Sequence, residues 1–202
     1  MASIELGRNG LLLDGNVVPL VSAEFHYFRH NAMWWPRCLQ AIKAAEIDIV
    51  STFVCWDFHE IAPGTFDFAG VTNPSRDLIG FLNQCAEADL KVLVRPGPVI
   101  DAGWETRGPA RDVMALERLD SVFLDRAAQY ISAVSEVLRP AQYTRGGPVI
   151  MLSIDDEILY PYNTSGSEFE SSGNVDLPYR PDSYDAAFRD LQEAKVLIEE
   201  LD

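Results

Sequence analysis

The chain has 202 residues, of which 48% are hydrophobic and 23% charged, and it carries a formal net charge of −15. These values are typical of a folded globular protein and exclude a disordered chain. So acidic a balance argues against nucleic acid or an anionic membrane as a partner, because both need a basic surface. No stretch approaches the roughly 20 apolar residues of a membrane span.

The first residues predict a β-hairpin. Asp14-Gly15 separates the apolar segments 11–13 and 17–18, and an Asp-Gly pair supplies the positive φ of a tight turn. We assign residues 1–18 to this N-terminal hairpin. No basic segment followed by an apolar run begins the chain, so no secretory signal is recognised and a cytoplasmic location is expected.

After the hairpin, short apolar segments alternate with amphipathic ones. Strands are predicted over residues 20–25, 47–56, 91–95 and 149–154. Apolar residues at helical spacing predict helices over about 35–45, 78–85 and 123–138, and a last helix begins near Asp182. Because the strands are nearly continuous in apolar residues, we expect a parallel sheet that is buried on both faces.

Four such units predict an α/β fold, which is either a doubly wound sheet or part of a (β/α)₈ barrel. No GxGxxG or Walker loop follows any strand, which argues against a nucleotide-binding sheet, and no cofactor is expected. The chain is short for a complete barrel of about 250 residues. The three cysteines, Cys38, Cys55 and Cys85, lie in apolar stretches and are expected to be core residues.

Polar residues follow the end of every predicted strand, and in a barrel that edge carries the chemistry. Asp155-Asp156-Glu157 directly follows the fourth strand. A glycosidase needs two carboxyl groups, one to protonate the leaving oxygen and one to attack or to activate water. Aromatic side chains near the strand ends could stack on a sugar ring, and these are Tyr27, Phe53, Trp56 and Trp104.

Each of these signals also has a structural interpretation. The three acids fit a solvated loop equally well, and a single tryptophan is more often part of the core. His26, His30 and His59 form no HxH or HExxH pattern, so no metal site is expected.

Five segments together resemble glycoside hydrolase family 35, the β-galactosidases. They occur in that family's order and at close to its spacing, within a match that runs from about Leu13 to Tyr160: residues 22–29 (SAEFHYFR), 52–60 (TFVCWDFHE), 64–70 (GTFDFAG), 95–98 (RPGP) and 146–150 (GGPVI). The resemblance implies that residues 1–202 form one incomplete catalytic domain. It would hold about the first four β-α units of a (β/α)₈ barrel after the hairpin.

The resemblance also implies the roles of individual residues in retaining hydrolysis of a β-linked, galactoside-like sugar. Glu157 would be the general acid/base, and Asp156 would contact the sugar. Apart from the resemblance, we expect Arg95 to steady the carboxylates and Trp56 and Trp104 to line the pocket, with Tyr27 and Phe53 placed to contribute. The nucleophile in this family is a second Glu after strand seven, which this chain does not contain.

Three positions depart from the family pattern. The Asn before the acid/base is Asp156 here, which can accept but not donate a hydrogen bond. The Glu of an Ala-Glu-Trp segment is Gly103, and a Tyr hydroxyl is lost at Phe53. These changes keep open a different β-glycoside as substrate, a carbohydrate-binding protein without activity, or a truncated fragment.

Two further expectations complete the sequence-based picture. A metal-dependent hydrolase using Asp155, Asp156 and a histidine is a third reading of the same residues. An isolated half barrel would expose unpaired strand edges, so self-association and inactivity of the 202-residue chain alone are expected.

Overall fold

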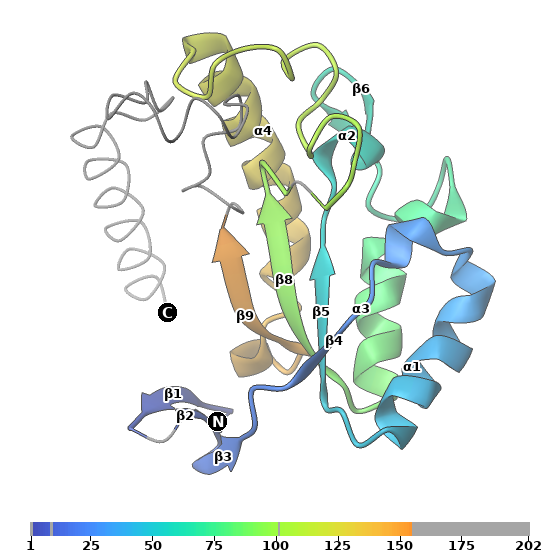
Figure 1. Cartoon of the computed structure of the whole chain (residues 1–202), viewed down its shortest axis with the longest axis vertical. Helices are drawn as coiled ribbons and strands as arrows, with labels where there is room; N and C mark the ends of the chain where they lie inside the picture. The colour runs from blue at the N-terminus through green and yellow to red at the C-terminus, as the bar shows by residue number, and fades with distance from the viewer. Residues whose placement is uncertain (1, 9, 101, 155–202) are drawn as a thin grey trace, which may run out of the picture. The chain divides into compact units, whose positions relative to one another are not determined.

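The computed structural model describes residues 2–8, 10–100 and 102–154. A small antiparallel sheet comes first, and parallel strands then alternate with helices (Figure 1). The predicted residues 155–157 and the helix near Asp182 lie outside the described residues.

The N-terminal sheet has the strand order β1-β2-β3, with β1 at Ile4–Gly7, β2 at Gly10–Leu13 and β3 at Asn16–Val18. The predicted Asp14-Gly15 turn joins β2 to β3, and both turn residues have positive φ (51° and 78°), as the tight hairpin turn requires. The sequence did not predict β1, which pairs antiparallel with β2 and extends the hairpin to three strands.

The second sheet is parallel throughout, with the order β4-β5-β8-β9. Its strands are β4 at Ser22–Glu24, β5 at Ile49–Phe53, β8 at Lys91–Gly97 and β9 at Val149–Ile154. The predicted α/β class with a parallel sheet is thus confirmed. Closure of the sheet into a barrel goes beyond these four strands and stays a prediction.

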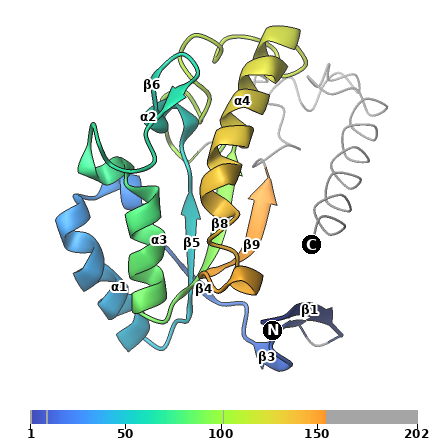
Figure 2. The same ribbon diagram turned by 180° about the vertical axis from the view of Figure 1, so that it is seen from behind.

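Helices α1 (Trp35–Ala44), α3 (Leu78–Glu87) and α4 (Ser121–Leu138) cover one face of the parallel sheet (Figure 2). The connections add a two-stranded ribbon, β6 (Glu60–Ala62) with β7 (Thr65–Phe66), and the short helix α2 (Trp56–His59). Four 3-10 turns complete the described elements: η1 (Tyr27–Arg29), η2 (Ala32–Trp34), η3 (Pro74–Arg76) and η4 (Tyr143–Arg145). No helix in the described ranges is long and apolar enough to cross a membrane.

The prediction that strand two runs to Trp56 was wrong. The strand ends at Phe53, and the chain then turns into α2 because new backbone partners are present there. The Asp57 N–H donates to the Gly108 carbonyl at 2.8 Å, and the His59 N–H donates to the Cys55 carbonyl at 3.1 Å. The first of these partners lies on a distant loop, so the local pattern contained no signal for it.

The core has one cluster on each face of the parallel sheet. Val50, Val92 and Val94 are fully buried against the helices, in a cluster that also contains Phe81 and Tyr130. On the opposite face, side chains of β2 pack against the beginnings of β5 and β9, in a cluster of Leu11, Leu13, Ile49 and Ile150. The N-terminal sheet therefore covers the end of the sheet at which the parallel strands begin.

Candidate active site

The register of the parallel sheet brings three side chains near the strand ends to one face. Glu24 of β4 pairs with Ser51 of β5, and Phe53 of β5 pairs with Arg95 of β8. Partners in neighbouring strands point to the same side, and residues two apart share a face. Glu24, Phe53 and Arg95 thus lie at the carboxyl ends of the strands, on the face away from the helices.

These residues and His26 form a compact group, which we call the rim cluster: Glu24, His26, Phe53 and Arg95. Nη2 of Arg95 pairs with Oε1 of Glu24, and the Arg95 guanidinium carbon lies 3.6 Å from the centre of the Phe53 ring. Nε2 of His26 lies 3.5 Å from the same Glu24 oxygen, and its ring centre is 5.0 Å from that of Phe53. The Phe53 ring packs against the Arg95 guanidinium, and the His26 ring lies beside Glu24, so the two rings support the Glu24–Arg95 pair.

The electrostatics of the rim cluster favour a neutral His26. Burial is the main cause that lowers the pKa of His26, and the nearby Arg29 and Arg95 lower it further, while Glu24 acts in the opposite direction. The Glu24 side chain is 56% exposed, whereas those of Arg95 and His26 are 21% and 16% exposed. The cluster therefore presents one accessible carboxylate above a mostly covered cation.

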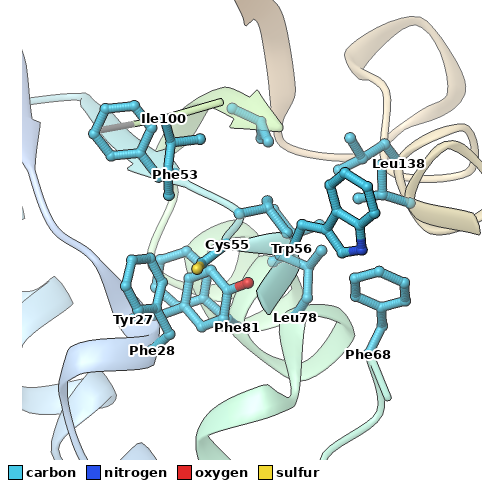
Figure 3. Packing of buried hydrophobic residues seen from close by; sticks show 14 of the residues in the cluster. Tyr27, Phe28, Phe53, Cys55, Trp56, Phe68, Leu78, Phe81, Ile100 and Leu138 are labelled. Carbon is cyan, nitrogen blue, oxygen red and sulfur yellow. The ribbon is translucent and has the colours of Figure 1, made fainter. Parts of the chain in front are cut away.

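Trp56 and Tyr27 lie in the core instead of lining a pocket. The Trp56 side chain is fully buried, stacks on Tyr130 at 5.3 Å, and donates from Nε1 to Oε2 of Glu60 at 2.8 Å. Tyr27 is fully buried as well, with its hydroxyl 2.5 Å from Nε2 of His59. Figure 3 shows both inside the buried cluster. For Trp56 the structural interpretation holds, and neither ring presents surface to a sugar.

Trp104 occupies an intermediate position on the connection that follows β8. Its ring packs edge-on against Phe28 and Phe58, with centres 5.5 and 5.9 Å apart, and Nε1 donates to Oδ2 of Asp57 at 3.0 Å. The indole is half-buried and remains accessible at the carboxyl edge. Gly103 beside it has a φ of +62°, and nothing lies within 4 Å of the position that a Cβ would take.

The structure thus brings together only part of the predicted site. Phe53 and Arg95 meet in the rim cluster, Trp104 lies on the loop at the same edge, and Asp156 and Glu157 lie outside the described residues. Glu24 and His26 lie within the segment 22–29 that resembles the family, but neither is among the site residues predicted from the sequence. The alternation that places Glu24 on the face of Phe53 was the signal that could have identified it.

Among the described residues, no three His, Cys, Asp or Glu side chains gather closely enough to hold a metal ion. The three cysteines are free, and Cys55 and Cys85 are buried core residues, as expected.

Comparisons with solved structures agree with the fold. The chain is similar to an endo-1,4-β-mannanase from Rhizomucor miehei, with a TM-score of 0.57 and 14% identity over 76% of this chain and 48% of that one. It is also similar to an exo-β-1,4-mannosidase from Opitutaceae bacterium strain TAV5, with a TM-score of 0.51 and 18% identity over 69% and 25% of the two chains. At identities of 14% and 18% these similarities show the fold alone.

Proteins found by sequence comparison have a higher sequence identity to the chain than these two structures. An exo-β-D-glucosaminidase of Thermococcus kodakarensis is 32% identical over 182 residues, which cover 79% of this chain and 23% of that protein. The β-galactosidase of Bos taurus is 32% identical over 159 residues, covering 76% and 24%. A β-1,2-glucosyltransferase of Ignavibacterium album is 34% identical over 159 residues, covering 69% and 22%. The chain thus spans about a quarter of the length of these relatives.

The profile of glycosyl hydrolases family 35 matches residues 10–180, which include the parallel sheet and the rim cluster. The family that the sequence motifs predicted is confirmed, and the chain belongs to glycosyl hydrolases family 35.

Proposed function

We propose that the intact protein hydrolyses a β-glycoside with retention of configuration, and that Glu157 is its general acid/base. One observation supports the proposal most directly. β9 ends at Ile154, paired with Gly97 beside Arg95, and the sequence continues at once with Asp155-Asp156-Glu157. The acidic segment therefore follows in sequence a strand whose end lies at the edge that carries Glu24 and Arg95, and barrel enzymes carry their catalytic groups at that edge.

In this mechanism Glu157 protonates the glycosidic oxygen while a nucleophilic carboxylate outside this chain attacks the anomeric carbon. The same residue then removes a proton from water, which releases the sugar from the glycosyl-enzyme. Arg95 is mostly covered and already pairs with Glu24, so it contributes a fixed positive charge at the edge.

Replacement of Glu157 by Gln in the full-length protein tests the assignment. We expect a loss of about 10²- to 10⁴-fold in kcat/KM on alkyl glycosides, whose leaving groups need a proton, and a smaller loss on dinitrophenyl glycosides. NMR of the first-formed anomer should show retention. Normal rates of the variant on alkyl glycosides, or an inverted product, would refute the mechanism. Sugar binding without any turnover by the full-length protein would instead identify a carbohydrate-binding protein.

The glycone is proposed to be galactoside-like, and Asp156 supports a second candidate, a 2-amino sugar. A carboxylate only accepts hydrogen bonds, and a sugar ammonium offers it a charge-assisted donor. Two relatives are named exo-β-D-glucosaminidase, from Thermococcus kodakarensis and from Pyrococcus horikoshii, the latter 30% identical over 184 residues.

The two glycones can be separated with Asp156→Asn. If the substrate is an amino sugar, the variant should lose about tenfold or more in kcat/KM on an aryl β-glucosaminide, because the charge-assisted bond is lost. Its kcat/KM on an aryl β-galactoside should hold or rise. The opposite ranking would favour the galactoside.

A further inference from the structure

In the Glu24–Arg95 pair, Arg95 contacts only one of the two oxygens of the Glu24 carboxylate. Arg95 and His26 both approach Oε1, and no described residue hydrogen-bonds Oε2. The side chain is 56% exposed on the face of the sheet that lies away from the helices. A carboxylate that is anchored through one oxygen and open at the other is suited to accept hydrogen bonds from a ligand.

The anchor makes this carboxylate rigid. The Arg95 guanidinium stacks 3.6 Å above the Phe53 ring, and Phe53 is itself 3% exposed. A long charged side chain at a surface normally loses conformational freedom when it binds a ligand, which weakens the binding. Glu24 has already lost that freedom, because Arg95 and Phe53 are held by the sheet register.

Two nitrogen atoms of the rim cluster have unsatisfied hydrogen-bonding capacity. Nδ1 of His26 and Nε of Arg95 are buried and have no hydrogen-bond partner among the described residues. Native proteins leave few such groups, and those that persist call for a reason other than packing. The Glu24 side of this ion pair is 56% exposed, and ion pairs that solvent reaches add little to stability, so the fold gains little from keeping these polar groups at this edge.

We propose that Glu24 is a substrate-binding residue, whose Oε2 accepts a hydrogen bond from a hydroxyl or ammonium group of the bound sugar. Arg95 and Phe53 act as positioning residues that hold the carboxylate toward the ligand. The inference rests on the proposed function for its ligand class, a monosaccharide unit at the carboxyl edge of the sheet. It adds a contact from strand β4, which the predicted site lacked.

The test uses Glu24→Gln in the full-length protein, with Glu136→Gln as the matched control. Glu136 is also an exposed carboxylate paired with an arginine, Arg139 at 3.2 Å, but it lies on α4. The Kd of galactose and of glucosamine is measured by calorimetry, and KM and kcat are measured with the aryl glycosides. We expect Glu24→Gln to raise Kd and KM about 10- to 100-fold with a much smaller change in kcat, and Glu136→Gln to change neither.

Thermal unfolding shows whether each variant is folded, and Glu24→Asp is the second variant if Glu24→Gln is not. The Asp keeps the charge but shortens the reach by one methylene, so it should also weaken binding. Unchanged Kd and KM in a folded Glu24 variant would overturn the proposal. If the wild type binds a sugar without turnover, the proposed function fails while the Kd comparison still tests Glu24. If the wild type binds neither sugar, the Glu24 proposal falls too.

Discussion

At the scale of single residues, His59 is held through both of its ring nitrogens. It is fully buried, and its Nδ1 lies 2.7 Å from the carbonyl oxygen of Asp67, which can only accept. Nδ1 must therefore carry the proton, and Nε2 accepts from the Tyr27 hydroxyl at 2.5 Å. Burial, which outweighs the opposing Asp67 carbonyl, lowers the pKa of His59 to about 4.

The lowered pKa of His59 predicts a loss of stability in acid. Between about pH 6.5 and 4 the unfolded chain binds a proton at this histidine and the folded chain does not, so the free energy of unfolding falls as the pH falls. The contribution is roughly 3 kcal/mol, present in full above pH 6.5. The variant His59→Gln lacks this pH-dependent contribution. The free energies of unfolding of wild type and variant, measured with urea, should therefore converge as the pH drops to 4.

The exposed His30 is the matched control, and the same measurements are made on His30→Gln. If the free energy of unfolding of His59→Gln and of the wild type changed in parallel with pH, the argument would be contradicted.

Asp67 has a separate effect on stability in acid. Burial would raise its pKa, but hydrogen bonds from Thr72, Val71 and Ala69 offset this and lower the pKa to about 2. The stability from Asp67 is lost only below about pH 3.8.

At the scale of elements, Arg126 joins α4 to β6 and to the loop after β8. Its Nη1 lies 2.8 Å from Oε1 of Glu60, and its Nη2 lies 3.1 Å from Oδ2 of Asp112. The guanidinium also lies 5.9 Å from the centre of the Trp56 ring, whose Nε1 donates to Glu60. These contacts hold the segment that carries Trp104 against the helix layer.

We expect Arg126→Met to destabilise the protein by about 3 kcal/mol. The methionine keeps the apolar stem but leaves Glu60, whose side chain is 5% exposed, as a buried charge without its counter-ion. Urea unfolding measures the effect. Arg139→Met, which removes an arginine that is 60% exposed, should cost less than about 1 kcal/mol.

The double variant Glu60→Gln with Arg126→Met shows whether the buried charge of Glu60 causes the loss of stability. It should recover part of the loss, because the uncompensated charge is gone. A double variant no more stable than Arg126→Met alone would show that the lost packing, and not the buried charge, determines the cost.

At the scale of the whole molecule, the described parallel sheet has two outer strands, β4 and β9. Each pairs with a strand on one side, and β9 also presents Leu152 and Ile154, which are 37% and 40% exposed. Unpaired backbone groups beside exposed apolar side chains favour pairing with another chain. The 202-residue chain is therefore expected to self-associate through these strands.

Sedimentation velocity over a range of concentrations checks this expectation. Leu152→Lys should shift the chain toward the monomer, because a charge on an outer strand opposes pairing. Leu124→Lys makes the same change at a residue on α4 that is 49% exposed, and it should leave the association unchanged. A wild type that remains monomeric, or an equal effect of both variants, would contradict association through the sheet edge.

Local pattern was sufficient for much of the architecture. The strand predicted over residues 149–154 matches β9, and the apolar spacing of residues 123–138 matches α4, because burial on a sheet or a helix face imposes periods that the sequence records directly. The family followed from five motifs in order, which no single element could have indicated.

The tertiary structure decided what each side chain at the strand ends does. Trp56 and Tyr27 lie in the core because residues far along the chain, Tyr130 and His59, pack against them. Glu24 meets Arg95 across 71 positions of sequence because parallel register places their strands on the same sheet. The sequence alone determined the fold class, the family and the edge where polar groups gather. Which of those groups are exposed to solvent and which are buried in the core depends on long-range packing, which local periodicity does not encode.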